Sequence, residues 1–182
     1  MPHRLRLVSA LLVALVVLPL AGCDTGGGPS TRLLVDGEYR ITRLELDSEN
    51  TTYGVINVLP YLSQSGLPPQ PDISLDLFGQ QSTYTFAYRL GGDAARTGVQ
   101  GRFTTSASTV RINVGEGNAA ALRRLLLPTA LVFTASGTNG STLSTDVRHT
   151  VSFADLAALD PDRFRNISGS LSGRLRITAE RL

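Results

Sequence analysis

The sequence has one cysteine, no lysine, no tryptophan and only two histidines. Because Cys23 has no second thiol to pair with, the chain forms no internal disulfide and must be stabilised by packing. The cysteine and cysteine–histidine sets that bind structural zinc are excluded for the same reason. Without lysine there is no phosphate-binding loop, so Gly115-Glu116-Gly117-Asn118 is interpreted as a turn with a helix cap.

The chain also has little net charge beyond its first residues. All 17 basic residues are arginines, against 15 acidic residues. Without Arg4 and Arg6, which lie in residues 1–22, 15 arginines remain against the same 15 acidic residues. Nucleic-acid binding requires a basic patch or stripe, so we expect no nucleic-acid partner.

The longest apolar run lies at the N-terminus and is short for a membrane span. His3, Arg4 and Arg6 precede the apolar residues 7–20, whereas a membrane-spanning helix needs about 20 apolar residues. A basic start followed by an apolar segment of this length is typical of a secretory signal peptide.

The apolar run ends in Leu20-Ala21-Gly22-Cys23, which resembles the lipobox of bacterial lipoproteins. The resemblance implies that residues 1–22 are a type II signal peptide and that Cys23 carries a diacylglyceryl group after cleavage. It implies a protein of the bacterial cell envelope, anchored by lipid to the inner or outer membrane on the periplasmic side. Two or three acyl chains hold a protein firmly at a membrane where one would be marginal, because each buried methylene contributes about 0.8 kcal/mol.

Residues 23–33 form the lipidated cysteine and a linker. The segment 24–31 reads Asp-Thr-Gly-Gly-Gly-Pro-Ser-Thr, which cannot bury apolar area and predicts a flexible tether. Fully extended, such a segment reaches at most about 26–29 Å at roughly 3.3–3.6 Å per residue. We therefore expect the domain at residues 34–182 to stay close to the bilayer.

Alternation of apolar and polar residues dominates residues 34–182 and predicts an all-β domain. The clearest strand is 83–90, where Tyr84, Phe86, Tyr88 and Leu90 alternate with polar or small residues. Further strands are predicted at 34–46, 73–77, 101–105, 109–114, 130–135, 143–151 and 171–179. The phase of the apolar residues changes at Thr42–Arg43, which predicts a β-bulge there.

Two short segments have helical periodicity instead. Residues 118–127 place several leucines on one face, with Asn118 as the expected cap. Residues 153–159 follow Ser152, which is expected to cap them, and Asp155 takes the capping-box position. Asp160-Pro161 is expected to end this second helix.

Many short strands joined in sequence, with one or two short helices, predict a barrel or a sandwich. The pattern resembles the lipocalin-like proteins among the calycins, through Gly37-Glu38-Tyr39-Arg40-Ile41, the strand 83–90, Gly101-Arg102-Phe103 and the C-terminal Gly173-Arg174-Leu175-Arg176-Ile177. This resemblance implies a single antiparallel up-and-down β-barrel of about eight strands. A β-sandwich is the second choice.

Candidate site residues are few. His149 is the only histidine after residue 22, and no Gly-x-Ser-x-Gly elbow accompanies it, so we expect no enzyme, metal site or cofactor. The aromatic face of Tyr84, Phe86 and Tyr88 either fills a barrel interior or, together with His149, lines a ligand cup.

Two functions remain open on the sequence. In the first, a lipid-anchored envelope protein binds a small apolar ligand inside its barrel. In the second, the barrel or sandwich is filled, and the protein is structural or contacts another, unidentified envelope component. An open interior of roughly a few hundred cubic ångströms favours the first function, and a filled interior with an exposed apolar patch favours the second.

Overall fold

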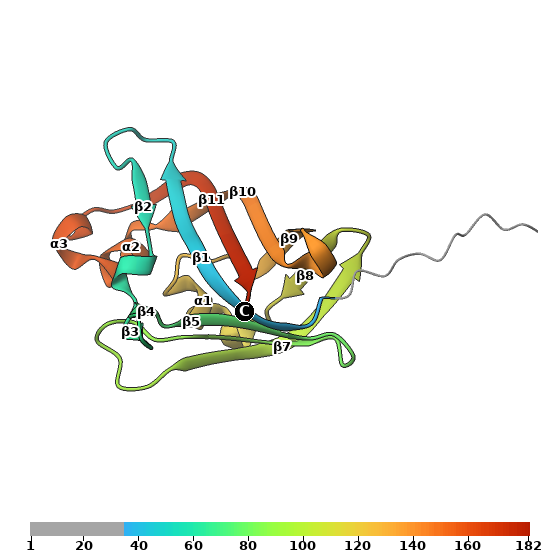
Figure 1. The fold of residues 1–182 in the computed structure, drawn as a ribbon. Helices are drawn as coiled ribbons and strands as arrows, with labels where there is room; N and C mark the ends of the chain where they lie inside the picture. The colour runs from blue at the N-terminus through green and yellow to red at the C-terminus, as the bar shows by residue number, and fades with distance from the viewer. Residues whose placement is uncertain (1–34) are drawn as a thin grey trace, which may run out of the picture. The chain divides into compact units, whose positions relative to one another are not determined.

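The computed structural model describes residues 35–182, which belong to the unit Thr31–Leu182. The predicted leader 1–22, the lipidation site Cys23 and the linker 23–33 lie outside the described residues. Strands dominate the described part, as the alternation predicted (Figure 1).

The strands and helices follow one another along the chain with short connections. The strands are β1 (Gly37–Ser48), β2 (Val55–Asn57), β3 (Gln64–Ser65), β4 (Gln70–Pro71), β5 (Ile73–Phe78), β6 (Thr83–Tyr88), β7 (Thr97–Ser106), β8 (Thr109–Asn113), β9 (Ala130–Ser136), β10 (Thr142–Ser152) and β11 (Ser170–Arg181). The helices are α1 (Ala119–Arg123), α2 (Phe153–Leu159) and α3 (Pro161–Phe164), and 3₁₀ turns lie at Leu59–Tyr61, Glu116–Asn118 and Thr138–Gly140.

Eight of the strands form a closed antiparallel barrel. Their hydrogen-bonded order is β1-β5-β6-β7-β8-β9-β10-β11, and β11 pairs back with β1. Neighbours in this ring are also consecutive along the chain among the barrel strands, which makes the barrel up-and-down. Because β11 pairs with β1, the chain forms the predicted barrel and not the sandwich that was the second choice.

β1 bends so that its two halves pair with different strands. Its register with β11 shifts between Ile41 and Arg43, so Thr42 is the extra residue of a β-bulge. The half before the bulge pairs with β5, and the half after it pairs with β2. The bulge was predicted at this position, and it lets both Ile41 and Leu44 be buried.

Successive side chains of a strand point to opposite faces, so alternate residues of each barrel strand face the interior. These inward residues form the hydrophobic core. Along β6 the pattern alternates between buried and partly exposed residues without a break. The other barrel strands contribute, among others, Tyr39, Leu44, Leu75, Val99, Phe103, Ile112, Phe133, Leu143 and Leu175, all buried.

The helix α1 is shorter than the sequence suggested, and Asn118 does not cap it. A 3₁₀ turn precedes α1, and the side chain of Asn118 makes no capping hydrogen bond. The backbone of Asn118 has φ −104° and ψ −2°, whereas a capping residue usually has extended backbone. The capping prediction was therefore wrong, because the chain is already helical when it reaches this residue.

The second predicted helix, α2, begins as expected. Ser152 Oγ accepts a hydrogen bond from the backbone N–H of Asp155 at 3.0 Å, and the Ser152 hydroxyl donates to the Asp155 carboxylate at 2.7 Å. Pro161 ends α2 but also begins α3, where the Asp160 carboxylate accepts from the backbone N–H of Arg163 at 3.1 Å. Proline suits the first position of a helix, because its missing N–H has no helical partner there.

Candidate functional site

The aromatic face predicted from the sequence lies inside the barrel. Tyr84, Phe86 and Tyr88 are 1%, 5% and 0% exposed. The Tyr88 hydroxyl donates to the carbonyl of Ala121 at 2.6 Å, and the Tyr84 hydroxyl makes a longer contact of 3.5 Å with the carbonyl of Asn113. Burial raises the pKa of both tyrosines, so their hydroxyls stay protonated at neutral pH.

A third buried tyrosine closes the core near the β9–β10 turn. The Tyr39 hydroxyl donates to the carbonyl of Gly140 at 2.9 Å and accepts from the Arg181 guanidinium at 2.8 Å. The same guanidinium lies over the Tyr39 ring, 5.3 Å from its centroid, and donates to the carbonyl of Asn139 at 2.7 Å. The hydroxyls of all three interior tyrosines thus bond within the chain and need no ligand to satisfy them.

Side chains fill the barrel. Inward-facing residues of different strands, such as Tyr39, Leu75 and Leu143, are 0% exposed. An empty cup of a few hundred cubic ångströms, roughly the lower limit for ligand sites, would expose the side chains that line it. The leucines of α1 and the turn after it (Leu122, Leu125, Leu126 and Leu127) belong to the same core.

His149 lies apart from the aromatic face, on β10 opposite Gly173. Its half-buried imidazole lies against the turn that follows α1. Burial lowers the pKa of His149 more than a hydrogen bond to the backbone of Leu126 raises it, so the ring is neutral at pH 7. His149 lines a surface cleft of about 270 Å³ whose other walls include Leu127, Pro128 and Val151. The structure therefore brings together three of the four predicted site residues, but not the histidine.

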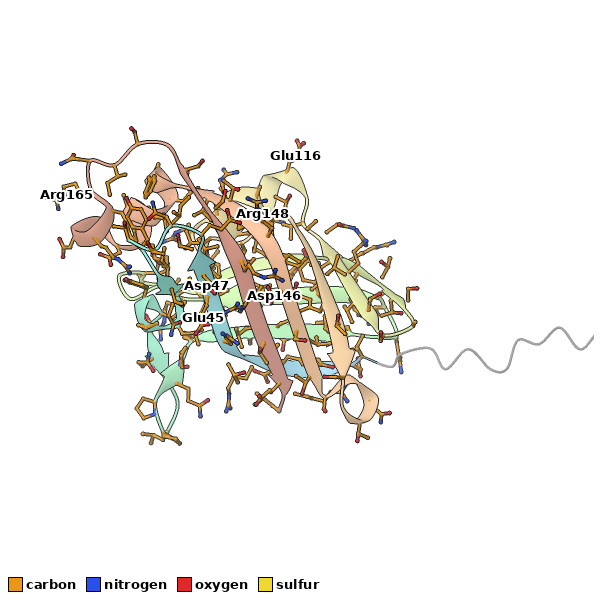
Figure 2. The ribbon with its side chains drawn as sticks, turned by 90° about the horizontal axis from the view of Figure 1, so that it is seen from above. Glu45, Asp47, Glu116, Asp146, Arg148 and Arg165 are labelled. Carbon is orange, nitrogen blue, oxygen red and sulfur yellow. The ribbon has the colours of Figure 1, made fainter. Side chains whose placement is uncertain are left out.

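The barrel wall is incomplete between β9 and β10. The two strands pair only at Thr142–Ser136, Leu143–Ala135 and Ser144–Thr134, whereas β10 pairs with β11 along its whole length. Beyond Ser144 the strands draw apart toward the turn that carries Glu116 (Figure 2). We call the gap between residues 130–133 of β9 and residues 145–151 of β10 the seam.

A cleft of about 570 Å³ opens on the outer surface where the strands part. The short side chains of Thr178, Ser144 and Thr134 are neighbours across the strands and line this cleft. Arg43, Val132, Asp146 and Arg176 are among the other lining residues. The lining also includes Thr145 and Val147, so the cleft extends to the seam.

At the seam, the inward-facing residues of β10 differ in how far their side chains are exposed to solvent. Val147 is in the inward phase of the strand but is 36% exposed, since β9 has left β10 before this position. Thr145, its inward neighbour, is only 7% exposed, and its hydroxyl has no hydrogen-bond partner. Both residues line the cleft.

Outside the seam, charged side chains form ion pairs across β1, β11 and β10. Arg176 lies 3.0 Å from Asp47 and 3.6 Å from Asp146, and Arg174 lies 2.8 Å from Asp146. Figure 2 labels Asp47, Asp146 and Arg148 on this face. Exposed pairs such as these contribute little to stability, roughly 0–1 kcal/mol each, so they define the charge of the surface more than they stabilise the barrel.

Two further clefts lie on the outer surface. One of about 300 Å³ lies beside β3, β4 and β5 and contains Asp72, whose carboxylate is paired with Arg96 at 2.8 Å and with Arg89 at 3.0 Å. The other, of about 530 Å³, lies over β6 and β7. Among residues 35–182, no group of three or more histidine, cysteine or acidic residues is placed to hold a metal ion. None of the helices in that part of the chain is long and apolar enough to cross a membrane.

Sequence reasoning had no signal for the seam. It predicted a strand at 143–151, in which alternation puts Thr145, Val147 and His149 on one face, but alternation does not say which strand covers that face. The missing information was the length over which β9 follows β10, which local alternation does not determine.

No family model matches this chain, and neither a curated protein nor a solved structure matches it.

Proposed function

We propose that this chain is a lipid-anchored lipoprotein of the bacterial cell envelope whose barrel contacts another envelope component through its outer surface. The filled interior is the observation that carries the proposal. Each of the eight barrel strands contributes buried inward side chains to the core, with Val147 at the seam the exposed exception, and the clefts described above open on the outside. A barrel of this kind is a rigid scaffold that presents a surface.

The membrane part of the proposal rests on the lipobox Leu20-Ala21-Gly22-Cys23. Acylation of Cys23 would hold the domain at the membrane through the short linker 24–31. The closed up-and-down barrel supports the resemblance to the lipocalin-like proteins, since this is the architecture that the resemblance implied.

The proposed role is binding without catalysis. The carboxylate of Asp155, the acidic residue that shares the cleft of His149, accepts a hydrogen bond from Ser152 at 2.7 Å and so belongs to the cap of α2. Among the described residues that line that cleft, Asp155 is the only acidic one, and the other side chains beside His149 are largely apolar, which suits a binding wall.

Photo-crosslinking in the host cell tests the proposal. A benzophenone amino acid would replace Phe78 or Val147, which are 46% and 36% exposed, or the interior residue Phe86 as the matched control. We expect a defined protein adduct from outer positions and none from Phe86. An adduct between position 86 and a small molecule, with no protein adduct from outer positions, would contradict the proposal.

A small apolar ligand remains a second candidate, but outside the barrel. The cleft of about 270 Å³ beside His149 is walled largely by Leu126, Leu127, Pro128 and Val151. Native mass spectrometry of the lipoprotein extracted from its own membranes tests this function. A bound small molecule that is lost in His149→Arg, which adds a charge to the cleft, would support it, and a ligand-free mass would contradict it.

A further inference from the structure

We propose that the partner binds as an extended peptide strand along the seam-facing edge of β10 at residues 145–148, before the turn after α1 covers residues 149–151. This inference rests on the proposed function, because it names the chemistry of the partner and its place on the outer surface.

The first observation is that part of the β10 backbone has no partner among the described strands on the side of β9. In an antiparallel ladder, alternate residues bond to one neighbouring strand, and the residues between them turn N–H and C=O to the other side. β10 pairs with β11 from Thr142 to Ser152, but with β9 only as far as Ser144. Within residues 35–182, no backbone hydrogen bond from a loop or helix reaches residues 145–151. Unpaired strand edges of this kind are templates for another strand.

The hydroxyl of Thr145 is the second, independent observation. Thr145 is 7% exposed, and its Oγ1 has neither a donor nor an acceptor near it in the described part of the chain. Buried polar groups in native proteins nearly always have a partner, because an unpaired one destabilises the fold. A polar group of a bound peptide would supply the missing hydrogen bond at the cleft.

The shape and chemistry of the cleft fit an extended peptide. Its volume of about 570 Å³ lies within the range of roughly 300–1,000 Å³ that is usual for ligand sites. Val147 offers an apolar contact, and Asp146 and Arg176 border the outer side. We therefore expect a peptide with a small apolar side chain facing Val147 and polar side chains on either side of it. A small apolar molecule would leave the backbone groups of β10 unpaired.

A second copy of the chain fits this edge less well. Its own β10 also lies beside its own β9, inside its own seam. Paired strands lie about 4.8 Å apart, so two such edges could meet only if β9 left the wall in both copies. A free peptide segment brings no neighbouring strand of its own to the seam.

Selection from a random heptapeptide phage-display library tests the inference, with the full lipidated protein in detergent micelles as the target. Enriched peptides would be synthesised with a fluorescent label and titrated by fluorescence anisotropy. We expect Val147→Lys, which places a charge at the centre of the seam, to weaken binding by tenfold or more. The matched control is Val55→Lys on β2, because Val55 is 50% exposed and does not line this cleft, and it should bind as the wild type does.

A second variant keeps the test independent of folding defects. Thr145→Val keeps the shape of the side chain and removes the unpaired hydroxyl, so its melting temperature should equal or exceed that of the wild type. Peptide binding should weaken about threefold to tenfold, the fold-change that corresponds to one net hydrogen bond. Methylation of alternate peptide nitrogens should abolish binding, because it removes the backbone donors and leaves the side chains.

The outcomes separate this inference from the proposed function. Peptides that bind Val147→Lys and the wild type equally well overturn the seam as the site, as does failure to enrich any peptide. In both cases, a protein adduct in the photo-crosslinking experiment would leave the proposed function standing. Absence of any protein adduct at outer positions would instead overturn the proposed function itself.

Discussion

Side chains on one face of β6 are buried in the core, and those on the other face are partly exposed. Substitutions on the two faces should therefore differ in their effect on the free energy of unfolding. Phe86 is 5% exposed in the core, whereas Thr85 is on the opposite face and only partly buried. The alternation of the sequence was sufficient to predict this contrast, because one strand face must be buried and only one face is apolar.

Phe86→Ala should lower the free energy of unfolding by about 3–5 kcal/mol, because it removes a large side chain from a packed interior. Thr85→Ala should cost less than about 1 kcal/mol, since it is a substitution on the outer face. Urea melts of both variants test this prediction. Equal destabilisation would show that both faces are buried and that the assignment of the interior is wrong.

The environment of His149 makes stability depend on pH. Burial lowers the pKa of His149 in the folded chain below its unfolded value, which is about 6.5. Between the two pKa values the unfolded chain binds more protons, so this contribution to stability is present above about pH 6.5 and is lost as pH falls through the folded pKa. His149→Gln should flatten the stability profile in that window.

Urea melts of the wild type and of His149→Gln at several pH values from 7.5 to below the folded pKa provide the measurement. Identical pH slopes in the two proteins would contradict a neutral, half-buried imidazole. Sequence alone placed His149 on an inward strand face, but it could not place the turn after α1 beside the ring.

At the scale of elements, closure of the barrel depends on how closely β11 approaches β1. A Cβ atom on Gly173 would lie 2.5 Å from the backbone carbonyl oxygen of Asp47, and backbone cannot move aside as a flexible side chain can. Gly98 in β7 has nothing within 4 Å of the corresponding position. An added methyl group would therefore clash with backbone at Gly173 but has free space at Gly98.

Gly173→Ala should be strongly destabilising, by more than about 2 kcal/mol, because strand closure must shift to relieve the contact. Gly98→Ala is the matched control and should be neutral or slightly stabilising, since glycine is unfavourable in strands. Thermal melts of both variants decide between these outcomes. A Gly173→Ala variant as stable as the control would show that the β1–β11 closure is looser than described.

The cap of α2 gives a smaller prediction at the same scale. Ser152→Ala removes the hydrogen bond from the backbone N–H of Asp155 and should cost about 1 kcal/mol. Asn118→Ala is the control and should cost less, because Asn118 makes no capping bond. A reversal of this order in denaturant melts would contradict the two cap assignments.

Features of the helices and strands could be predicted from the sequence where a few neighbouring residues determine them. The bulge at Thr42 and the cap at Ser152 each followed from a few neighbouring residues. The extent of α1 and the parting of β9 from β10 did not, because neither has a signal in the neighbouring residues. In such segments tertiary packing overrides local propensity.

For the whole molecule, the prediction to test is that a lipid on Cys23 attaches the protein to a membrane. Cys23→Ser should abolish incorporation of radiolabelled palmitate and release the protein from the membrane fraction or leave its precursor uncleaved. The reason is that Cys23 is the only cysteine in the chain, so no other thiol can carry the diacylglyceryl group. Equal palmitate label in the serine variant and in the wild type would contradict the lipoprotein assignment.

The filled barrel interior is the central claim, and xenon binding to crystals of the domain measures it directly. Dry apolar cavities take up xenon, and an engineered void of roughly 150 Å³ is large enough to bind it. We expect no xenon site within the wild-type barrel and a new site in Phe86→Ala, the positive control. A xenon atom or an ordered small molecule among Tyr84, Phe86 and Tyr88 in the wild type would contradict the claim and favour a ligand-binding interior.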